Sequence, residues 1–189
     1  MLVQNFPLTT RFAAQNRITN PQGQAPFKIP QPIRDWLFDP GSLTRRLIAA
    51  AKGDFVVNVL RQYRGYPTLT EQQALKQPLR SLSFIREVEL ICQGKPWVFA
   101  RTVIPIHTLQ GETNQLTALG SKPLGAVLFS SPRVRRGPIT AKLINSNTLP
   151  QSTPITQCNL WGRHSVFFIG QQSLLVNEIF LPESPLYNQ

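Results

Sequence analysis

Residues 81–105, SLSFIREVELICQGKPWVFARTVIP, constrain the fold more than any other part of the chain. On both sides of QGK, apolar side chains recur at about every second position, which is the period of a β-strand. Two such runs joined by a short turn that contains glycine are typical of a β-hairpin. The sequence therefore predicts two neighbouring antiparallel strands, at residues 81–92 and 96–105.

The first of these strands carries a charge among its apolar residues. Side chains of a strand alternate between two faces, and Arg86 falls on the same face as Phe84, Val88 and Leu90. Arginine is almost never fully buried unless it is paired. We therefore expect Arg86 to have a defined partner or ligand inside the fold.

The last strand of the chain, SLLVNEIFLP, shows the same pattern with the opposite charge. Glu178 lies between Val176 and Phe180 on one face, while the other face carries Asn177 and Ile179. Since both faces carry apolar residues, the strand is covered on both sides, and Glu178 is expected to be buried.

Two interpretations of Arg86 and Glu178 are open at this point. In the first, they form a structural ion pair, although apolar replacements of such pairs are often neutral for stability. In the second, they line a cavity. The arginine fork then suits a carboxylate, and the glutamate suits a hydroxyl group or proton transfer.

The region before this hairpin predicts one helix and one strand. Ser42 is a suitable N-cap for LTRRLIAAAK, and Gly53 is expected to end that helix. The following DFVVNVLRQYRGYP is rich in β-forming residues. Its expected apolar face consists of Phe55, Val57, Val59 and Tyr63.

The remaining segments complete an α+β pattern. TEQQALKQ predicts one or two helical turns, residues 113–130 predict short helical pieces broken by Gly120 and Pro123, and PRVRRGPITAKLI predicts a strand. HSVFFIGQQSLLVNEIFLP predicts a second hairpin with GQQ at its tip. The prediction is a single domain with roughly six antiparallel strands, helices covering one face and an internal ligand cavity.

The chain divides into an extension and one domain. Residues 1–34 are rich in proline and glutamine, and residues 35–189 are expected to form the folded domain. No apolar run is long enough to span a membrane, and no secretory signal is evident. Cys92 lies in an apolar strand as a core residue, and Cys158 fits no metal or redox motif. These features favour a cytoplasmic protein.

The formal net charge of +11 has three interpretations. It can be a solvated basic surface, a field that attracts a small anionic substrate, or a nucleic-acid interface. The densest basic cluster is SPRVRRG, at residues 131–137, and no zinc finger, RNA motif or helix-turn-helix pattern accompanies it. Charge alone does not decide among the three.

Several longer motifs point to one family. FIREVELICQGKPWVFARTVIP, LGSKPLGAVLFSS, LWGRHS and LLVNEIFLPESPLY, in this order, resemble blocks of the chorismate pyruvate-lyase family. DWLFDPGSLTRRL resembles the N-terminal helix of that family. The resemblance covers about residues 35 to 187. Two features depart from it: the N-terminal extension and a long polar loop at residues 145–159.

The resemblance implies a lyase that converts chorismate to 4-hydroxybenzoate and pyruvate. The reaction uses no metal and no organic cofactor, and the product lies in an internal cavity. It would be the first committed step towards a quinone ring, ubiquinone or plastoquinone. The resemblance further implies a monomer with small-molecule partners only, without nucleic acid and without a membrane span.

The resemblance also implies roles for individual residues. Arg86 in FIRE matches the arginine that binds the ring carboxylate, and Glu178 in NEIF matches the glutamate near the 4-hydroxyl group. These two are the catalytic candidates. Leu124 matches a leucine whose backbone helps to hold the carboxylate, and Leu43 matches a substrate-binding position that is methionine elsewhere.

The second carboxylate of chorismate, on the enolpyruvyl group, also needs a cation. The candidates are Arg101, Arg163 and Lys122, and Arg101 shares a strand face with Phe99 and Val103. The two histidines, His107 and His164, are expected at strand ends in surface or capping roles, because neither has a sequence partner that would orient a base.

A ligand sensor is the alternative function. Some transcriptional regulators contain a non-catalytic, ligand-sensing domain of the same fold, joined to a DNA-binding domain. Here about 35 residues precede the resemblance, and they are too rich in proline for a winged helix. The sequence therefore favours the enzyme over the sensor.

Overall fold

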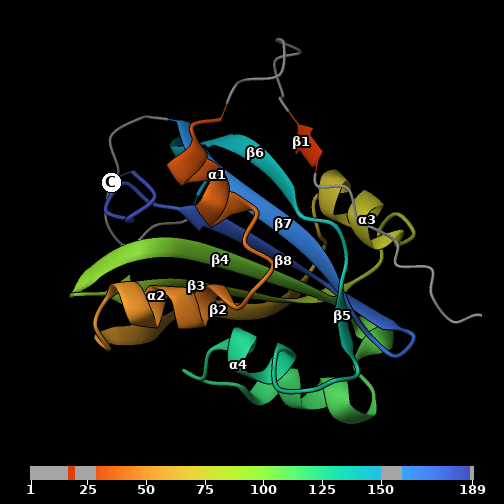
Figure 1. Cartoon of the computed structure of the whole chain (residues 1–189). Coiled ribbons are helices and arrows are strands. Elements are labelled where there is room, and N and C mark those ends of the chain that lie inside the picture. Colours follow the sequence, from red (N-terminus) through yellow and green to blue (C-terminus); the bar gives the residue numbers. More distant parts are fainter. Residues whose placement is uncertain (1–16, 20–28, 150–158, 188–189) are drawn as a thin grey trace, which may run out of the picture.

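A computed structural model of the chain describes residues 17–19, 29–149 and 159–187, in which eight strands form one twisted sheet (Figure 1). The strand order is β1-β6-β7-β8-β4-β3-β2, and β5 pairs with β7. The β1–β6 pair is parallel and all other pairs are antiparallel. The strands are β1 (Arg17–Thr19), β2 (Phe55–Gly65), β3 (Ser83–Cys92), β4 (Lys95–Pro105), β5 (Val134–Arg136), β6 (Thr140–Asn145), β7 (Asn159–Ile169) and β8 (Gln172–Phe180).

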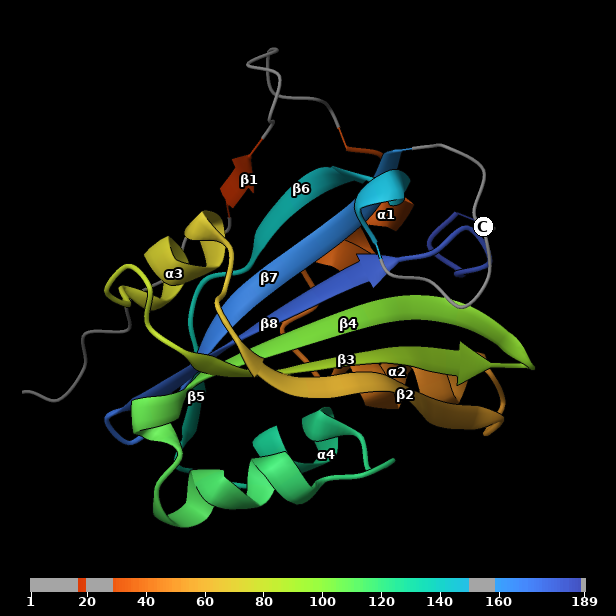
Figure 2. The same cartoon turned by 180° about the vertical axis from the view of Figure 1, so that it is seen from behind.

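The helices are short and lie between the strands in sequence. They are α1 (Gln31–Leu37), α2 (Leu43–Ala50), α3 (Leu69–Leu75), α4 (Leu124–Leu128) and the 3-10 helices η1 (Ile106–Thr108), η2 (Gly111–Ala118) and η3 (Ser146–Thr148). In Figure 1, α1, α2 and α4 lie on one side of the sheet; in the reverse view of Figure 2, α3 lies on the other side, where it packs on β8. The α+β prediction is confirmed, with α3 as an addition on the second face.

Six of the eight strands are long, and they are the strands that the sequence predicts. The additional strands β1 and β5 have three residues each. The segment PRVRRGPITAKLI, expected as one strand, is divided into β5 and β6 at Gly137 and Pro138, because proline has no N–H to donate to a ladder. Both pieces pair with β7.

Both predicted hairpins are confirmed. Strands β3 and β4 pair antiparallel through a turn in which Gln93 and Gly94 have φ of 51° and 71°. Positive φ at both central positions is the geometry of a type I′ turn, which glycine adopts without strain. Strands β7 and β8 form the second hairpin. Their pairing extends from Gly162 opposite Ile179 to Ile169 opposite Gln172.

The predicted cap of α2 is confirmed, and α3 has a cap that the sequence analysis did not name. The Ser42 side chain accepts a hydrogen bond from Arg45 N at the start of α2. At α3, Thr68 and Glu71 form a capping box, in which each side chain accepts from the other residue's backbone N–H. These caps fix where α2 and α3 begin, on opposite faces of the sheet.

Strand β2 corrects one predicted face. The register shifts between Val59 and Arg61, so that Val59 pairs with Val88 but Tyr63 pairs with Ile85. Such a bulge moves the later side chains to the opposite face. Tyr63 therefore does not share the face of Val59, and its hydroxyl group accepts a hydrogen bond from Arg101 on the reverse side.

The expected division at residue 35 stays a prediction, and α1 crosses it. Cys92 is buried and free, as expected, and burial raises the pKa of its thiol to about 11. Cys158 and most of the loop, residues 150–158, lie outside the described residues. Among the helices that the structure describes, none is long and apolar enough to cross a membrane.

Candidate active site

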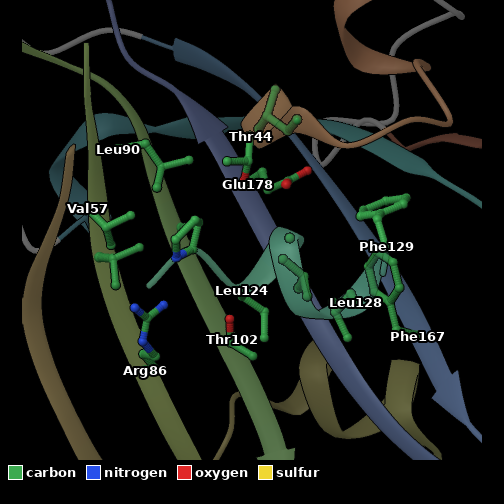
Figure 3. A pocket seen from close by; sticks show the side chains of 16 residues that line it. Thr44, Val57, Arg86, Leu90, Thr102, Leu124, Leu128, Phe129, Phe167 and Glu178 are labelled. Atoms are coloured by element: carbon green, nitrogen blue, oxygen red, sulfur yellow. The ribbon is translucent and has the colours of Figure 1, made fainter. Parts of the chain in front are cut away.

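A cavity lies between the sheet and the two helices α2 and α4, with about 500 Å³ of empty space including its mouth. Most of its lining is apolar, as in ligand pockets generally. The polar side chains are Thr44 on α2, Arg86 on β3, Thr102 on β4 and Glu178 on β8 (Figure 3). The apolar lining includes Leu43, Val57, Val88, Leu90, Leu124, Leu128, Phe129, Phe167 and Val176.

Helix α4 approaches α2 closely because it carries Gly125. A Cβ atom at this position would lie 2.8 Å from Thr44 Oγ1, which is closer than side chains normally come. The small residue therefore brings Leu124 and Thr44 to the same wall of the cavity. The sequence assigned Leu124 and Leu43 to the site, and both line it.

Arg86 is 3% exposed, and its guanidinium group is only partly engaged. Nη2 donates to the carbonyl oxygens of Gly120, at 2.9 Å, and Lys122, at 3.3 Å. Nε is buried and has no hydrogen-bond partner among the described residues. Burial lowers the pKa of Arg86 from its usual value. A buried cation with an unused donor in a cavity wall suits a carboxylate ligand.

Glu178, on β8, lines the same cavity at a position separate from Arg86, and its side chain is 16% exposed. Oε2 accepts a 2.6 Å hydrogen bond from Nε of Arg163, and Nη2 of Arg136 lies 3.8 Å away. No described residue hydrogen-bonds Oε1. Two cations therefore balance this carboxylate, and one of its oxygens is available to a ligand.

The structure decides between the two interpretations of the opposite charges. Arg86 bonds to backbone carbonyl groups and Glu178 bonds to Arg163, so they do not form an ion pair with each other. Both line the cavity, at separate positions (Figure 3). The cavity interpretation is therefore the one that the geometry supports.

Arg101 is not a cavity residue. It lies on the reverse face of β4, where it bonds Glu71 at 2.8 Å, the Tyr63 hydroxyl at 3.0 Å, and Glu87. The expectation that it shares a face with Phe99 is confirmed, because both line a hollow on that reverse side. The face is wrong for the enolpyruvyl carboxylate, because Arg86 and Glu178 point to the other side of the sheet.

The two other candidate cations contact the site only indirectly. Lys122 contributes its carbonyl oxygen to Arg86, while its side chain is exposed. Arg163 is adjacent to Glu178 but does not line the cavity. Among the described lining residues, Arg86 is thus the only cation.

The two histidines have different environments. His107 is exposed in η1, as expected. His164 was expected at a strand end but lies inside β7, because that strand starts earlier, at Asn159. Its Nδ1 is buried, with no partner among the described residues. Burial, and next the charge of Lys142, lower the pKa of His164 to about 4.

We predict that His164 makes the protein less stable as the pH falls. Its folded pKa of about 4 lies below the unfolded value of about 6.5. Its contribution to the free energy of unfolding is therefore complete above pH 6.5 and declines towards pH 4. Urea unfolding at several pH values measures this effect. Between pH 6.5 and pH 4, the free energy of unfolding should decline less for His164→Asn than for the wild type. Identical pH profiles would show that His164 is not buried in its neutral form.

Sequence reasoning did not single out Thr44, Thr102 or Arg136. Thr102 could have been found from the predicted hairpin, because it pairs with Arg86 across β3 and β4 and shares a strand face with Ala100. Arg136 belongs to the cluster SPRVRRG, for which the sequence left a solvated surface, anion attraction and a nucleic-acid interface open. Its position beside Glu178 comes from the pairing of β5 with β7, which the sequence does not indicate.

The fold and the cavity define a single-sheet α+β protein with a mostly apolar cavity on one face of the sheet. The family model for chorismate lyase matches residues 14–189, and the chain belongs to this family. It is therefore an enzyme of the lyase class.

Relatives agree with this assignment, and two solved structures share the fold. A probable chorismate pyruvate-lyase of Aromatoleum aromaticum is 38% identical over 82% of this chain and 87% of its own. A probable chorismate pyruvate-lyase of Pseudomonas aeruginosa is 43% identical over 79% of this chain and 83% of its own. A GntR-family transcriptional regulator from Bacillus cereus has a TM-score of 0.50 at 12% identity, over 69% of this chain and 93% of that chain. PhnF from Mycobacterium smegmatis has a TM-score of 0.51 at 16% identity, over 76% of this chain and 64% of that chain. These two similarities concern the fold alone.

Proposed function

We propose that the protein converts chorismate to 4-hydroxybenzoate and pyruvate. The observation that carries this proposal is that one cavity is lined by two groups of opposite charge: Arg86, whose Nε has no partner among the described residues, and Glu178, whose Oε2 is held by Arg163. Chorismate and 4-hydroxybenzoate both have a carboxylate at one end of the ring and a hydroxyl group at the other. The names of the relatives support the same substrate.

In this proposal, Arg86 anchors the ring carboxylate. Its guanidinium fork can receive the carboxylate while Nη2 stays on the Gly120 and Lys122 carbonyl oxygens. Leu124, the first residue of α4, supplies a backbone N–H at the same wall, and Leu43 packs against the ring. The carboxylate thereby fixes the orientation of the ring relative to β8.

Glu178 acts at the C4 side of the ring. Forming 4-hydroxybenzoate removes the C4 hydrogen as a proton, and the electron pair of that C–H bond forms the C3–C4 double bond as the C3–O bond breaks. In one route Glu178 accepts the proton and pyruvate leaves as its enolate. In the other, Glu178 holds the hydroxyl group while the proton passes to the enolpyruvyl methylene carbon, and pyruvate leaves in its keto form. Aromatisation supplies the driving force, so the protein contributes orientation and charge stabilisation without a metal or organic cofactor.

We further propose that the product feeds the ring of a quinone, ubiquinone or plastoquinone. The enzyme would act as a cytoplasmic monomer on small molecules, with the +11 net charge attracting the dianionic substrate. The resemblance of the site blocks to the family supports this assignment.

The test is an assay without added metal or cofactor. The purified protein is incubated with chorismate, and 4-hydroxybenzoate and pyruvate are quantified. Equal amounts of both, and neither with folded Glu178→Ala, are the expected result. Binding of 4-hydroxybenzoate without turnover would contradict the proposal and indicate a ligand sensor on the same fold.

A further inference from the structure

Arg163 joins the Glu178 carboxylate to the segment of residues 35–41, which is the end of α1 and the chain that leads to α2. Its side chain is fully buried, and Nε donates to Glu178 Oε2 at 2.6 Å. Nη1 donates to the carbonyl oxygens of Trp36, Leu37 and Asp39 at 3.0, 3.2 and 3.0 Å. One planar group thus contacts both the proposed catalytic residue and the chain that leads into the cavity wall.

Arg136 makes a second, weaker connection between the same two parts. Nη2 lies 3.8 Å from Glu178 Oε2, and Nε donates to Ser165 Oγ at 3.0 Å. Nη1 lies 3.3 to 3.4 Å from the carbonyl oxygens of residues 39–41. The Phe167 ring, which lines the cavity, lies 5.3 Å from its guanidinium carbon.

The sheet fixes the direction of these contacts. Arg163 and Glu178 are direct register partners on β7 and β8, so their side chains project from the same face. Because Arg163 bonds Oε2 and Arg136 approaches the same atom, the two arginines hold the Glu178 side chain in this rotamer. One carboxylate oxygen is thus held, and the other has no hydrogen bond from the described residues.

We propose that Arg163, supported by Arg136, is a positioning residue that holds Glu178 Oε1 towards the substrate and ties this rotamer to the start of α2. This inference rests on the proposed function. Leu43 and Thr44 of α2 line the cavity immediately after the tied segment. The two arginines therefore set the distance between the wall of the cavity and its carboxylate.

The test uses Arg163→Lys and Arg136→Lys in the full chain. A lysine ammonium can keep one contact to Glu178 but cannot reach the carbonyl oxygens at the same time. We expect kcat to fall by about 100-fold for Arg163→Lys, since a displacement of about 1 Å can have such an effect. The Kd for 4-hydroxybenzoate should change by less than about threefold, because Arg86 is untouched.

Arg46→Lys is the matched control. Arg46 also fastens this segment, through the Asp35 carbonyl oxygen at 2.7 Å and Asp39 Oδ2 at 2.9 Å, but it does not contact Glu178. Its kcat should stay near the wild-type value. An equal loss in Arg46→Lys would overturn the inference, because the segment and not the carboxylate would then be responsible.

A double-mutant cycle separates positioning from a general structural effect. In a Glu178→Gln background, Arg163→Lys should cause little further loss of kcat, because the group it positions is already changed. If Arg163→Lys lowers kcat by the same factor in the Glu178→Gln background as in the wild type, the two residues act independently and the inference is overturned. If Arg163→Lys does not fold, Arg136→Lys takes its place in the cycle, with an expected loss of about tenfold. A wild type without turnover would instead refute the proposed function, and the positioning role with it.

Discussion

Arg86→Lys is expected to weaken binding of 4-hydroxybenzoate by roughly 10- to 150-fold while the protein stays folded. A hydrogen bond to a charged group contributes about 1.5–3 kcal/mol, which corresponds to that range. Lysine retains the charge but has no planar fork, so it cannot serve the carboxylate and the Gly120 and Lys122 carbonyl groups together. Isothermal titration calorimetry with 4-hydroxybenzoate measures the loss directly.

Arg101→Lys is the control for this substitution. Arg101 is another arginine of the central strands and is partly buried, but its partners Glu71, Glu87 and Tyr63 lie on the reverse face. Its replacement should lower the free energy of unfolding and leave the Kd unchanged. Wild-type affinity in Arg86→Lys would show that Arg86 does not anchor the carboxylate.

Glu178→Gln is expected to lower kcat by about 10²- to 10⁴-fold, the usual contribution of a general acid or base. The amide has nearly the same shape, so the cavity keeps its volume. It cannot accept the C4 proton, however, and its neutral amide oxygen, in the place of Oε2, is a weaker partner for Arg163 and Arg136 than a carboxylate oxygen. Single-turnover kinetics with saturating chorismate isolates the chemical step from product release.

The matched control is Glu71→Gln on α3. Glu71 is buried and bonded to Arg101 and Asn177 on the reverse face of the sheet, so its replacement should affect stability alone. A kcat for Glu178→Gln within threefold of the wild-type value would show that Glu178 takes no part in the chemical step.

Strand alternation was sufficient to find the two charged residues that line the cavity. Arg86 and Glu178 fall among apolar side chains with a period of two, and that period is a geometric property of every strand. The two hairpins were predictable for the same reason, since each has alternating runs on both sides of a glycine-containing turn. The structure confirms that both residues line one cavity.

Long-range pairing accounts for what the sequence could not show. Arg136 meets Glu178 only because β5 and β8 both pair with β7. The bulge after Val59 turns Tyr63 to the reverse face, although the residue pattern gives no sign of it. The position of α3 on the second face likewise depends on the contacts of Glu71 with Arg101 and Asn177. Such contacts have no local signature.

The central claim is that one cavity holds the ring between Arg86 and Glu178. A crystal structure of the protein with 4-hydroxybenzoate tests it most directly. We predict the carboxylate within hydrogen-bond distance of the Arg86 guanidinium group and the hydroxyl group at Glu178 Oε1. A ligand in the opposite orientation, or one bound in the reverse-face hollow beside Arg101 and Lys142, would contradict the account.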